Sequence, residues 1–243
     1  TNNNIAGGSS EVFSWAGECS DARHKVVVSL GPSDIFDIDN KAYLIIPETL
    51  DLDVLLIRGK DSDASLKYAL ESLNGVSLSE ATPPVYPQSY DGYDAVIVQE
   101  AGKGMVLEGV FREIGKSVEK GTDLIVFGFD ALLDVPKGEL DGLLPIEIAG
   151  ISDYGGSPVK VLDHNIFQNV DIDDITIQRY VQSVETKGSI VLASIQNLPA
   201  VATGEVGVGD VIFIATNPDT KWSDFSMQTS YPIFWYNVFY WLN

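Results

Sequence analysis

The sequence predicts an α/β fold in which helices cover both faces of a mainly parallel sheet. Continuous apolar runs occur at residues 52–57 (LDVLLI), 93–98 (YDAVIV) and 123–129 (DLIVFGF), a pattern typical of strands that are buried on both sides. Segments with helical periodicity separate these runs. Strands that alternate with helices imply parallel pairing, because each helix carries the chain back across the sheet.

Residues 1–50 follow a different pattern. Short β-type runs at 12–15, 25–30 and 42–46 are separated by turn-rich stretches such as GPSD and DIDN. They predict the closing strands of a small β-sandwich. Three strands are few for an independent sandwich, so we expect it to be incomplete and to begin upstream of the sequence. We therefore divide the chain into sandwich strands, 1–50, and an α/β domain, 51–243.

The α/β domain begins with the apolar run at 52–57. Leucines and an alanine at helical spacing follow at 66–73, and Asn74-Gly75 is a typical helix stop. VSLS at 76–79 predicts the second strand, and the run at 93–98 predicts the third after a proline-rich loop. A second amphipathic helix is expected over 107–118, before the fourth strand at 123–129.

The C-terminal third is richer in β-type runs. ITIQRY, SIVLAS, AVATGEV and DVIFIAT predict antiparallel strands that extend the sheet, with a tight turn at Gly207 and Gly209. An aromatic-rich helix closes the chain, with Ser230 as its expected cap and Pro232 in its first turn. This helix is too short for a bilayer span and contains Asn237, so we expect it to be a buried closing helix.

The charge balance limits the partners of the chain. The sequence has 35 acidic and 15 basic residues and a formal net charge of -20, which excludes nucleic acid as a partner because like charges repel. The opening residues TNNNIAGGSS lack the basic and apolar regions of a signal peptide, and no apolar run approaches the ~20 residues of a membrane span. The single cysteine, Cys19, has no partner for an internal disulfide.

Two glycine motifs do not predict a phosphate site. GKS at 115–117 has the wrong spacing from Gly109 and lies at the end of an expected helix, whereas a phosphate loop precedes a helix. Gly102 and Gly104 follow a strand and precede a helix, but no third glycine completes a dinucleotide fingerprint. We therefore predict no cofactor.

The titratable residues do not form a recognisable catalytic or metal-binding set. His24 and His164 lack a second ligand at the usual spacing, and Asp163-His164 has no nucleophile motif to serve. The acidic groups at 37–40 and 171–174 lack the glycine and the closing glutamate of a calcium loop. We predict no metal site and no catalytic residues.

One edge of the expected sheet could still bind a ligand. In open parallel sheets, ligands bind beyond the carboxyl ends of the strands. Lys60, Asp61, Glu100 and Asp130 follow those ends here and could hold a small polar ligand or a divalent cation. An ordinary solvated rim is the alternative interpretation.

Five stretches carry a family resemblance, and they are DIFDIDNKAYLIIPETLDLDVLLI (34–57), YDAVIVQEAGKG (93–104), VEKGTDLIVFG (118–128), LDGLLPIEI (140–148) and SDFSMQTSYPIFWYNVFYWL (223–242). Together they resemble the extracytoplasmic region of BatA-like membrane proteins, which combine a von Willebrand factor A domain with a class I glutamine amidotransferase-like domain. The resemblance implies a flavodoxin-like fold for 51–243 and a last helix that leads into a transmembrane segment. It also implies a location at the extracytoplasmic face of the cell membrane, with protein partners or other domains of the same polypeptide.

The resemblance also bears on the chemistry. Amidotransferases place a cysteine in a sharp G-x-C-x-G turn and use a downstream His-x-Glu. The comparable turn here is 128–132, where Asp130 takes the place of the nucleophile, and the chain contains no His-x-Glu. A carboxylate cannot replace a thiolate in forming a thioester, so we expect no glutaminase activity.

These observations favour a non-catalytic interaction or scaffold module. The alternative is a small-molecule or divalent-cation binder that uses the rim of Lys60, Asp61, Glu100 and Asp130. A hydrolase that uses Asp130 or His164 is a third hypothesis, and we give it the least weight.

Overall fold

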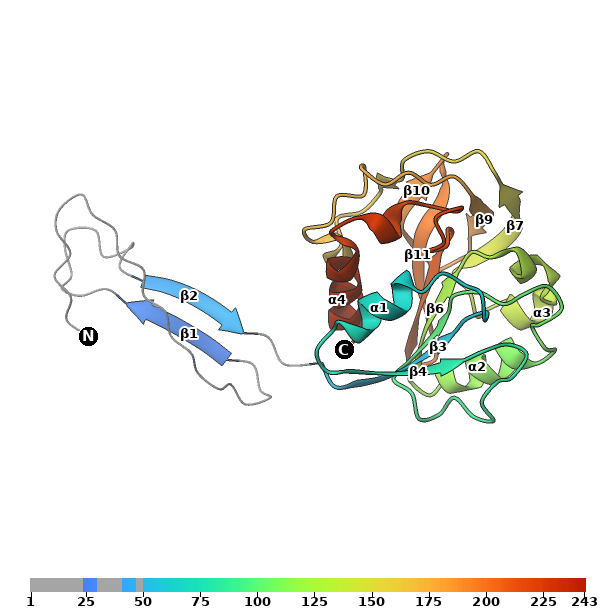
Figure 1. Cartoon of the computed structure of the whole chain (residues 1–243), viewed down its shortest axis with the longest axis horizontal. Coiled ribbons are helices and arrows are strands. Elements are labelled where there is room, and N and C mark those ends of the chain that lie inside the picture. Colours follow the sequence, from blue (N-terminus) through green and yellow to red (C-terminus); the bar gives the residue numbers. More distant parts are fainter. Residues whose placement is uncertain (1–23, 30–40, 47–49) are drawn as a thin grey trace. The chain divides into compact units, whose positions relative to one another are not determined.

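The computed structural model describes residues 24–29, 41–46 and 50–243, in two compact units, Thr1–Thr49 and Leu50–Asn243 (Figure 1). In the first unit, β1 (His24–Ser29) and β2 (Lys41–Ile46) form an antiparallel pair. The expected strand at 12–15 lies outside the described residues, so the β-sandwich stays a prediction.

The second unit is built on an eight-stranded sheet with the order β4-β3-β5-β6-β12-β11-β10-β8. The strands are β3 (Leu52–Ile57), β4 (Val76–Ala81), β5 (Ala95–Val98), β6 (Asp123–Phe127), β8 (Val159–Lys160), β10 (Ile190–Ile195), β11 (Leu198–Val206) and β12 (Gly209–Ile214). From β4 to β12 all neighbours are parallel, and from β12 to β8 all are antiparallel. The prediction of an α/β domain with an antiparallel extension is confirmed.

Four helices and three short 3-10 helices accompany the sheet in the described chain. They are α1 (Ser65–Glu71), α2 (Val110–Val118), α3 (Lys137–Leu140) and α4 (Tyr231–Leu242), with η1 (Asp130–Asp134), η2 (Asn165–Phe167) and η3 (Phe225–Met227). The crossovers through α1 and α2 step in opposite directions along the sheet. Because such crossovers are right-handed, α1 and α2 cover opposite faces.

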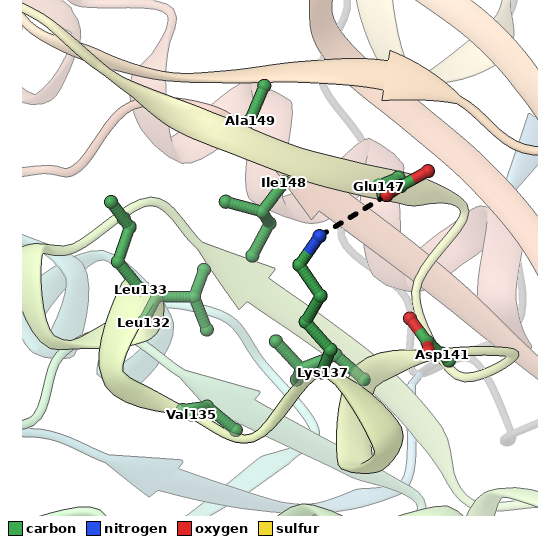
Figure 2. A pocket seen from close by; sticks show the side chains of 9 residues that line it. Leu132, Leu133, Val135, Lys137, Asp141, Glu147, Ile148 and Ala149 are labelled. Atoms are coloured by element: carbon green, nitrogen blue, oxygen red, sulfur yellow. Dashed lines mark hydrogen bonds and ion pairs between the residues drawn. The ribbon is translucent and has the colours of Figure 1, made fainter.

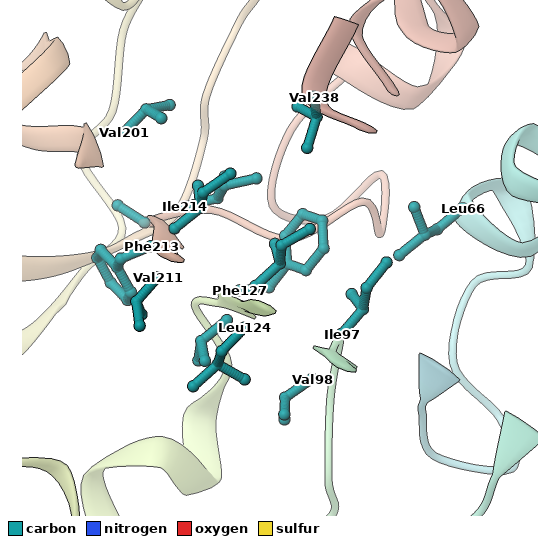
Figure 3. Packing of buried hydrophobic residues seen from close by; sticks show 14 of the residues in the cluster. Leu66, Ile97, Val98, Leu124, Phe127, Val201, Val211, Phe213, Ile214 and Val238 are labelled. Carbon is teal, nitrogen blue, oxygen red and sulfur yellow. The ribbon is translucent and has the colours of Figure 1, made fainter. Parts of the chain in front are cut away.

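The core lies between the sheet and these helices. The parallel strands are buried on both faces, as their continuous apolar sequences predict, and Val54, Ile97 and Ile125 have no exposed surface. Figure 3 shows Phe127 of β6 next to Ile97 of β5, with Val238 of α4 above Phe127 and Leu66 of α1 on the other side of Ile97.

The closing helix α4 packs through one face. Phe234, Trp235 and Phe239 are almost fully buried, and the Trp235 ring lies 5.8 Å from that of Phe127. Ile233, Tyr236 and Tyr240 remain exposed on the other face. Ser230 precedes the helix without a side-chain cap, so this expectation was wrong in detail, although Pro232 does lie in the first turn. Within the described residues, no helix has the length and apolarity needed to cross a membrane.

Several elements differ from the expectation. The strand expected at 175–180 begins only at Tyr180, because the preceding residues bridge to two other loops through Ile177. This strand, β9 (Tyr180–Glu185), pairs with β7 (Ile146–Ser152) in a separate antiparallel ribbon and not with the main sheet. The sequence did not predict β7, nor the short elements β8 and α3.

Candidate functional site

The carboxyl ends of β3, β5, β6 and β12 meet at one edge of the sheet, where the sequence placed the candidate ligand rim. After β3, the chain adds β4 on one side of this strand and then adds β5, β6 and β12 on the other side. The direction in which strands are added to the sheet therefore reverses between β3 and β5. Crevices in open α/β sheets form at such reversals, so the residues at this edge decide whether a ligand has room.

Asn217 holds three of the strand ends together. Its side chain is buried, and Nδ2 donates to the carbonyl oxygen of Gln99 at 2.8 Å and to that of Gly128 at 3.0 Å. Its Oδ1 accepts from the backbone N–H of Asp219 at 3.2 Å. One neutral amide therefore satisfies the carbonyls that end β5 and β6 and fixes the loop after β12.

Gln99 continues this network toward β3. The side chain is fully buried, and Nε2 donates to the carbonyl oxygen of Asp63 at 2.9 Å. The next residue, Glu100, accepts from the Ser62 hydroxyl at 2.8 Å. Two side-chain hydrogen bonds thus tie the loop after β3 to the end of β5, across the point where a ligand would enter.

Lys60 and Asp61 lie in the loop after β3 but take no part in the hydrogen-bond network of Asn217, Gln99 and Glu100. Both are exposed, and within the described part of the chain neither forms an ion pair or a side-chain hydrogen bond. Glu100 is close to their loop through Ser62. The predicted ligand residues therefore divide, with Lys60, Asp61 and Glu100 around the loop after β3 and Asp130 after β6.

Asp130 has an ionic partner that the sequence analysis did not identify. Arg179 Nη2 lies 2.6 Å from Asp130 Oδ1, and Arg179 Nε lies 3.3 Å from Asp153 Oδ1. The guanidinium carbon also lies 5.0 Å from the ring centroid of Trp222, which is a cation–π distance. Asp130 is thus held by an arginine that is itself stacked on a tryptophan.

The backbone around Asp130 does not form a strained nucleophile turn. Phe129 is extended, with φ -152 and ψ 158, and Asp130 begins the 3-10 helix η1. Among described non-glycine residues, positive φ occurs at Asn169, Gln196 and Asn197 and not between 128 and 132. Gly128 is required for another reason, because a Cβ there would lie 2.1 Å from the carbonyl oxygen of Ala215.

His164 is engaged in a local contact away from this turn. Its Nδ1 accepts from the backbone N–H of Ile166 at 3.4 Å, and its ring stands edge-on to Trp241 at 5.1 Å between centroids. Burial lowers the pKa of the imidazole, which favours its neutral form. Within residues 24–29, 41–46 and 50–243, no three His, Cys, Asp or Glu side chains gather as a metal-ligand set would.

The start of α2 is also occupied by the protein itself. GKS at 115–117 lies inside α2, as predicted, so it cannot form a phosphate loop. The backbone N–H of Gly109, immediately before α2, donates to Glu139 Oε1 at 2.7 Å. A buried carboxylate from α3 therefore sits where a helix N-terminus could attract an anion.

The amino ends of the same strands carry carboxylates. Asp94 Oδ2 accepts from the backbone N–H of Asp53 at 2.7 Å, and Asp123 Oδ1 accepts from that of Asp210 at 2.9 Å. Burial raises the pKa of Asp123 to about 7, although the N–H of Asp210 acts in the opposite direction. The nearby carboxylates of Asp210 and Asp94 raise this pKa further.

A hollow of about 210 Å³ lies between η1, α3 and β7 (Figure 2). Leu132, Val135 and Leu140 form its buried side, and Leu133 stands at its mouth with 44% of its surface exposed. Lys137 Nζ lies 3.4 Å from Glu147 Oε1 in the same hollow. No residue of the predicted rim lines it.

Fold and site define an α/β protein with a large, mostly parallel sheet whose strand ends are joined at the carboxyl edge by buried side chains. Residues 53–238 match the family described as Domain of unknown function (DUF7408), and the chain belongs to this family. No curated protein matches the sequence at a significant level.

Solved structures share the fold at low sequence identity. The Cytoplasmic Protein STM1381 from Salmonella typhimurium LT2 has a TM-score of 0.67 and 18% identity, over 79% of this chain and 99% of that one. A beta-galactosidase from Rahnella sp. R3 has a TM-score of 0.57 and 17% identity, over 78% of this chain and 31% of that one. A putative ThuA-like protein from Bacteroides uniformis has a TM-score of 0.56 and 12% identity, over 81% and 93%. These similarities establish the fold and not a shared activity.

Proposed function

We propose that the α/β unit is a non-catalytic interaction or scaffold module. The observation that carries this proposal is the buried Asn217 amide, which joins the ends of β5, β6 and β12 where related folds open a ligand crevice. The hydrogen bonds of Gln99 and Glu100 tie the remaining strand end, that of β3, to this network. The edge that would hold a substrate is used to hold the sheet together.

The finer fold assignment is part of the same proposal. If the parallel strands are counted in chain order, their spatial order is 2-1-3-4-5, which is that of flavodoxin-like folds. A class I amidotransferase-like domain has this general architecture and needs a thiolate nucleophile. Asp130 stands at the comparable position in a relaxed turn and is paired with Arg179, which supports a domain without that reaction.

We further propose that the module is attached to a longer, membrane-anchored polypeptide and works at its extracytoplasmic face. The resemblance of five sequence stretches to BatA-like proteins supports this attachment, and the partners would be other domains of that polypeptide or neighbouring proteins. The Rahnella beta-galactosidase, in which the similar region is 31% of the chain, provides a precedent for this fold as one part of a longer chain.

Calorimetry separates this proposal from the ligand-binding alternative. The chain is titrated with calcium, with magnesium and with a panel of small polar metabolites, and we expect no saturable heat. Saturable binding that Glu100→Gln or Asp130→Asn abolishes, while Glu119→Gln leaves it intact, would overturn the proposal. Glu119 is a suitable control because it is exposed and lies at the end of α2, close to the amino end of β6 and at the opposite edge of the sheet from the candidate rim.

A positive test uses affinity capture. The tagged full chain is cross-linked in an extract of its source organism and compared with an empty tag and with heat-unfolded chain. We expect specific recovery of a protein that depends on the folded state. Recovery no better than with the empty tag counts against a scaffold role.

A further inference from the structure

Strand β7 has one pairing partner among the described strands. Its ladder with β9 runs from Ile146↔Glu185 to Ser152↔Tyr180, with a bulge between Ile148 and Gly150. Figure 1 shows β7 at the outside of this ribbon. The second edge of such a strand presents backbone N–H and C=O groups that another extended chain can pair with.

The hollow of about 210 Å³ lies beside this strand. Glu147, Ile148 and Ala149 of β7 form one wall, and η1 and α3 supply the others (Figure 2). Its inner surface is made by the buried side chains of Leu132, Val135 and Leu140. A strand edge next to a pocket with an apolar inner wall is an arrangement by which domains bind an added strand, because the backbone supplies affinity and the pocket selects a side chain.

The charges at the mouth indicate what can approach. Glu147 and Asp141 line the hollow, and among the described residues Lys137 is the one basic side chain in its lining. The ion pair between Lys137 and Glu147 is 3.4 Å long, and both side chains are largely exposed, so it contributes little and is readily exchanged. On a chain with a formal net charge of -20, this site attracts a basic segment.

The same charges disfavour a second copy of this chain as the occupant. Antiparallel pairing of β7 with β7 of another copy would bring two acidic surfaces together, including the exposed Glu147 of each. Like charges across a strand pair are destabilising. A partner with lysine or arginine beside an apolar residue has no such cost.

We propose that β7 and this hollow dock an extended, basic segment of a partner protein. The segment adds a strand to the free edge of β7, one bulky apolar side chain enters the hollow, and flanking basic residues contact Glu147 and Asp141. This inference rests on the proposed interaction function and names the chemistry of the partner.

The test uses a set of labelled heptapeptides with β-branched residues, a lysine at each end, and Val, Leu, Ile or Phe at the centre. Fluorescence anisotropy with the full chain is expected to give saturable binding for at least one member. Methylation of alternate backbone nitrogens should weaken that binding at least about tenfold, since it removes the strand hydrogen bonds. The absence of saturable binding across the set would overturn the inference.

Two variants locate the peptide on the molecule. Leu133→Lys places a charge at the mouth of the hollow and should weaken binding about tenfold or more, as should Ala149→Arg on the opposite wall. Leu162→Lys is the matched control, because Leu162 is exposed to 46%, close to the 44% of Leu133, and does not line the hollow. Equal effects of Leu133→Lys and Leu162→Lys would place the peptide elsewhere and reject this site.

A charge exchange tests the specificity. Glu147→Lys should shift the preference from lysine-flanked to glutamate-flanked peptides, whereas Glu119→Lys, at the end of α2, makes the same change of net charge outside the hollow and should not. Light scattering tests the other occupant. A wild-type dimer that Leu133→Lys dissociates would assign the surface to self-association and overturn the inference.

The outcomes separate this inference from the proposed function. If the chain captures a partner that Leu133→Lys and Ala149→Arg still bind, the docking site is wrong and the module survives. If a metabolite binds at the carboxyl edge through Glu100 or Asp130, the proposed scaffold function is wrong, regardless of the result of the peptide titrations.

Discussion

The two ends of the parallel strands are tied together by different chemistry. At the carboxyl ends, the buried amides of Asn217 and Gln99 bond to backbone carbonyls. At the amino ends, the carboxylates of Asp94 and Asp123 accept the N–H groups of Asp53 and Asp210, the second residues of β3 and β12. Amides do not titrate, whereas the carboxyl group of Asp123 does, so the ties made by Asn217 and Gln99 are insensitive to pH and the tie made by Asp123 is sensitive to it.

The two ends also differ in charge. The neutral amides of Asn217 and Gln99 join the strand ends at the carboxyl edge, whereas carboxylates do so at the amino edge. At the acidic end, the partly buried carboxyl group of Asp123 is tolerated because it satisfies a backbone donor. Replacing one hydrogen-bonding side chain at each end measures how much the two ends differ in their contribution to stability.

The largest effect is expected at Asn217. Asn217→Ala removes hydrogen bonds to Gln99 and Gly128 and leaves two carbonyls with no donor, so the free energy of unfolding should fall by about 2–4 kcal/mol. Urea denaturation followed by tryptophan fluorescence measures the change. Asn74→Ala, at an exposed asparagine just before Gly75, is the control and should cost less than about 0.5 kcal/mol. A loss no larger than that of the control would show that this edge is not held by the amide.

A smaller, pH-dependent effect is expected at Asp123. The folded state raises the pKa of Asp123 from 3.8 to about 7, so the folded chain binds more protons than the unfolded chain between these values. The Asp123 contribution to stability therefore decreases as the pH rises from about 4 to about 7. Asp123→Asn stays neutral and can still accept from the N–H of Asp210.

The Asp123→Asn variant should match the wild type near pH 4 and exceed it at pH 8. We expect a gain of about 1 kcal/mol at pH 8, because the carboxyl group keeps some contact with solvent, which corresponds to roughly 2–4 °C in the melting temperature. Thermal melts from pH 4 to pH 8 measure the difference between the two proteins. A constant difference across this range would contradict the assignment.

The smallest effect is expected at Arg179, on the rim of the carboxyl end. Arg179→Lys keeps the charge but loses the planar contact with Trp222 and the geometry toward Asp130 and Asp153. Because these carboxylates are exposed, we expect a loss of about 0.5–1 kcal/mol. The loss should shrink in 1 M salt, and a salt-independent loss would point to packing on Trp222 instead.

The sequence predicts the strands of the parallel sheet because their burial is recorded in continuous apolar runs such as 52–57 and 123–127. It does not reveal β7, whose mixed sequence IEIAGIS lies in a ribbon with one face exposed. The sequence predicts where the candidate ligand rim lies but not which distant side chains contact its residues. Asn217 meets Gln99 across 118 residues, and Arg179 meets Asp130 across 49, and neither separation leaves a local pattern.

The place of β12 in the sheet has a consequence for biosynthesis. β12 completes the parallel half against β6, but Asp210 and its partner Asp123 are 87 residues apart in the chain. At ribosomal speeds of about 5–20 residues per second, β6 emerges on the order of 10 s before its neighbour exists. During that interval the apolar edge of β6 is open to wrong pairing, so nascent chains that stop before β12 should be the species that chaperones retain and that aggregate most readily.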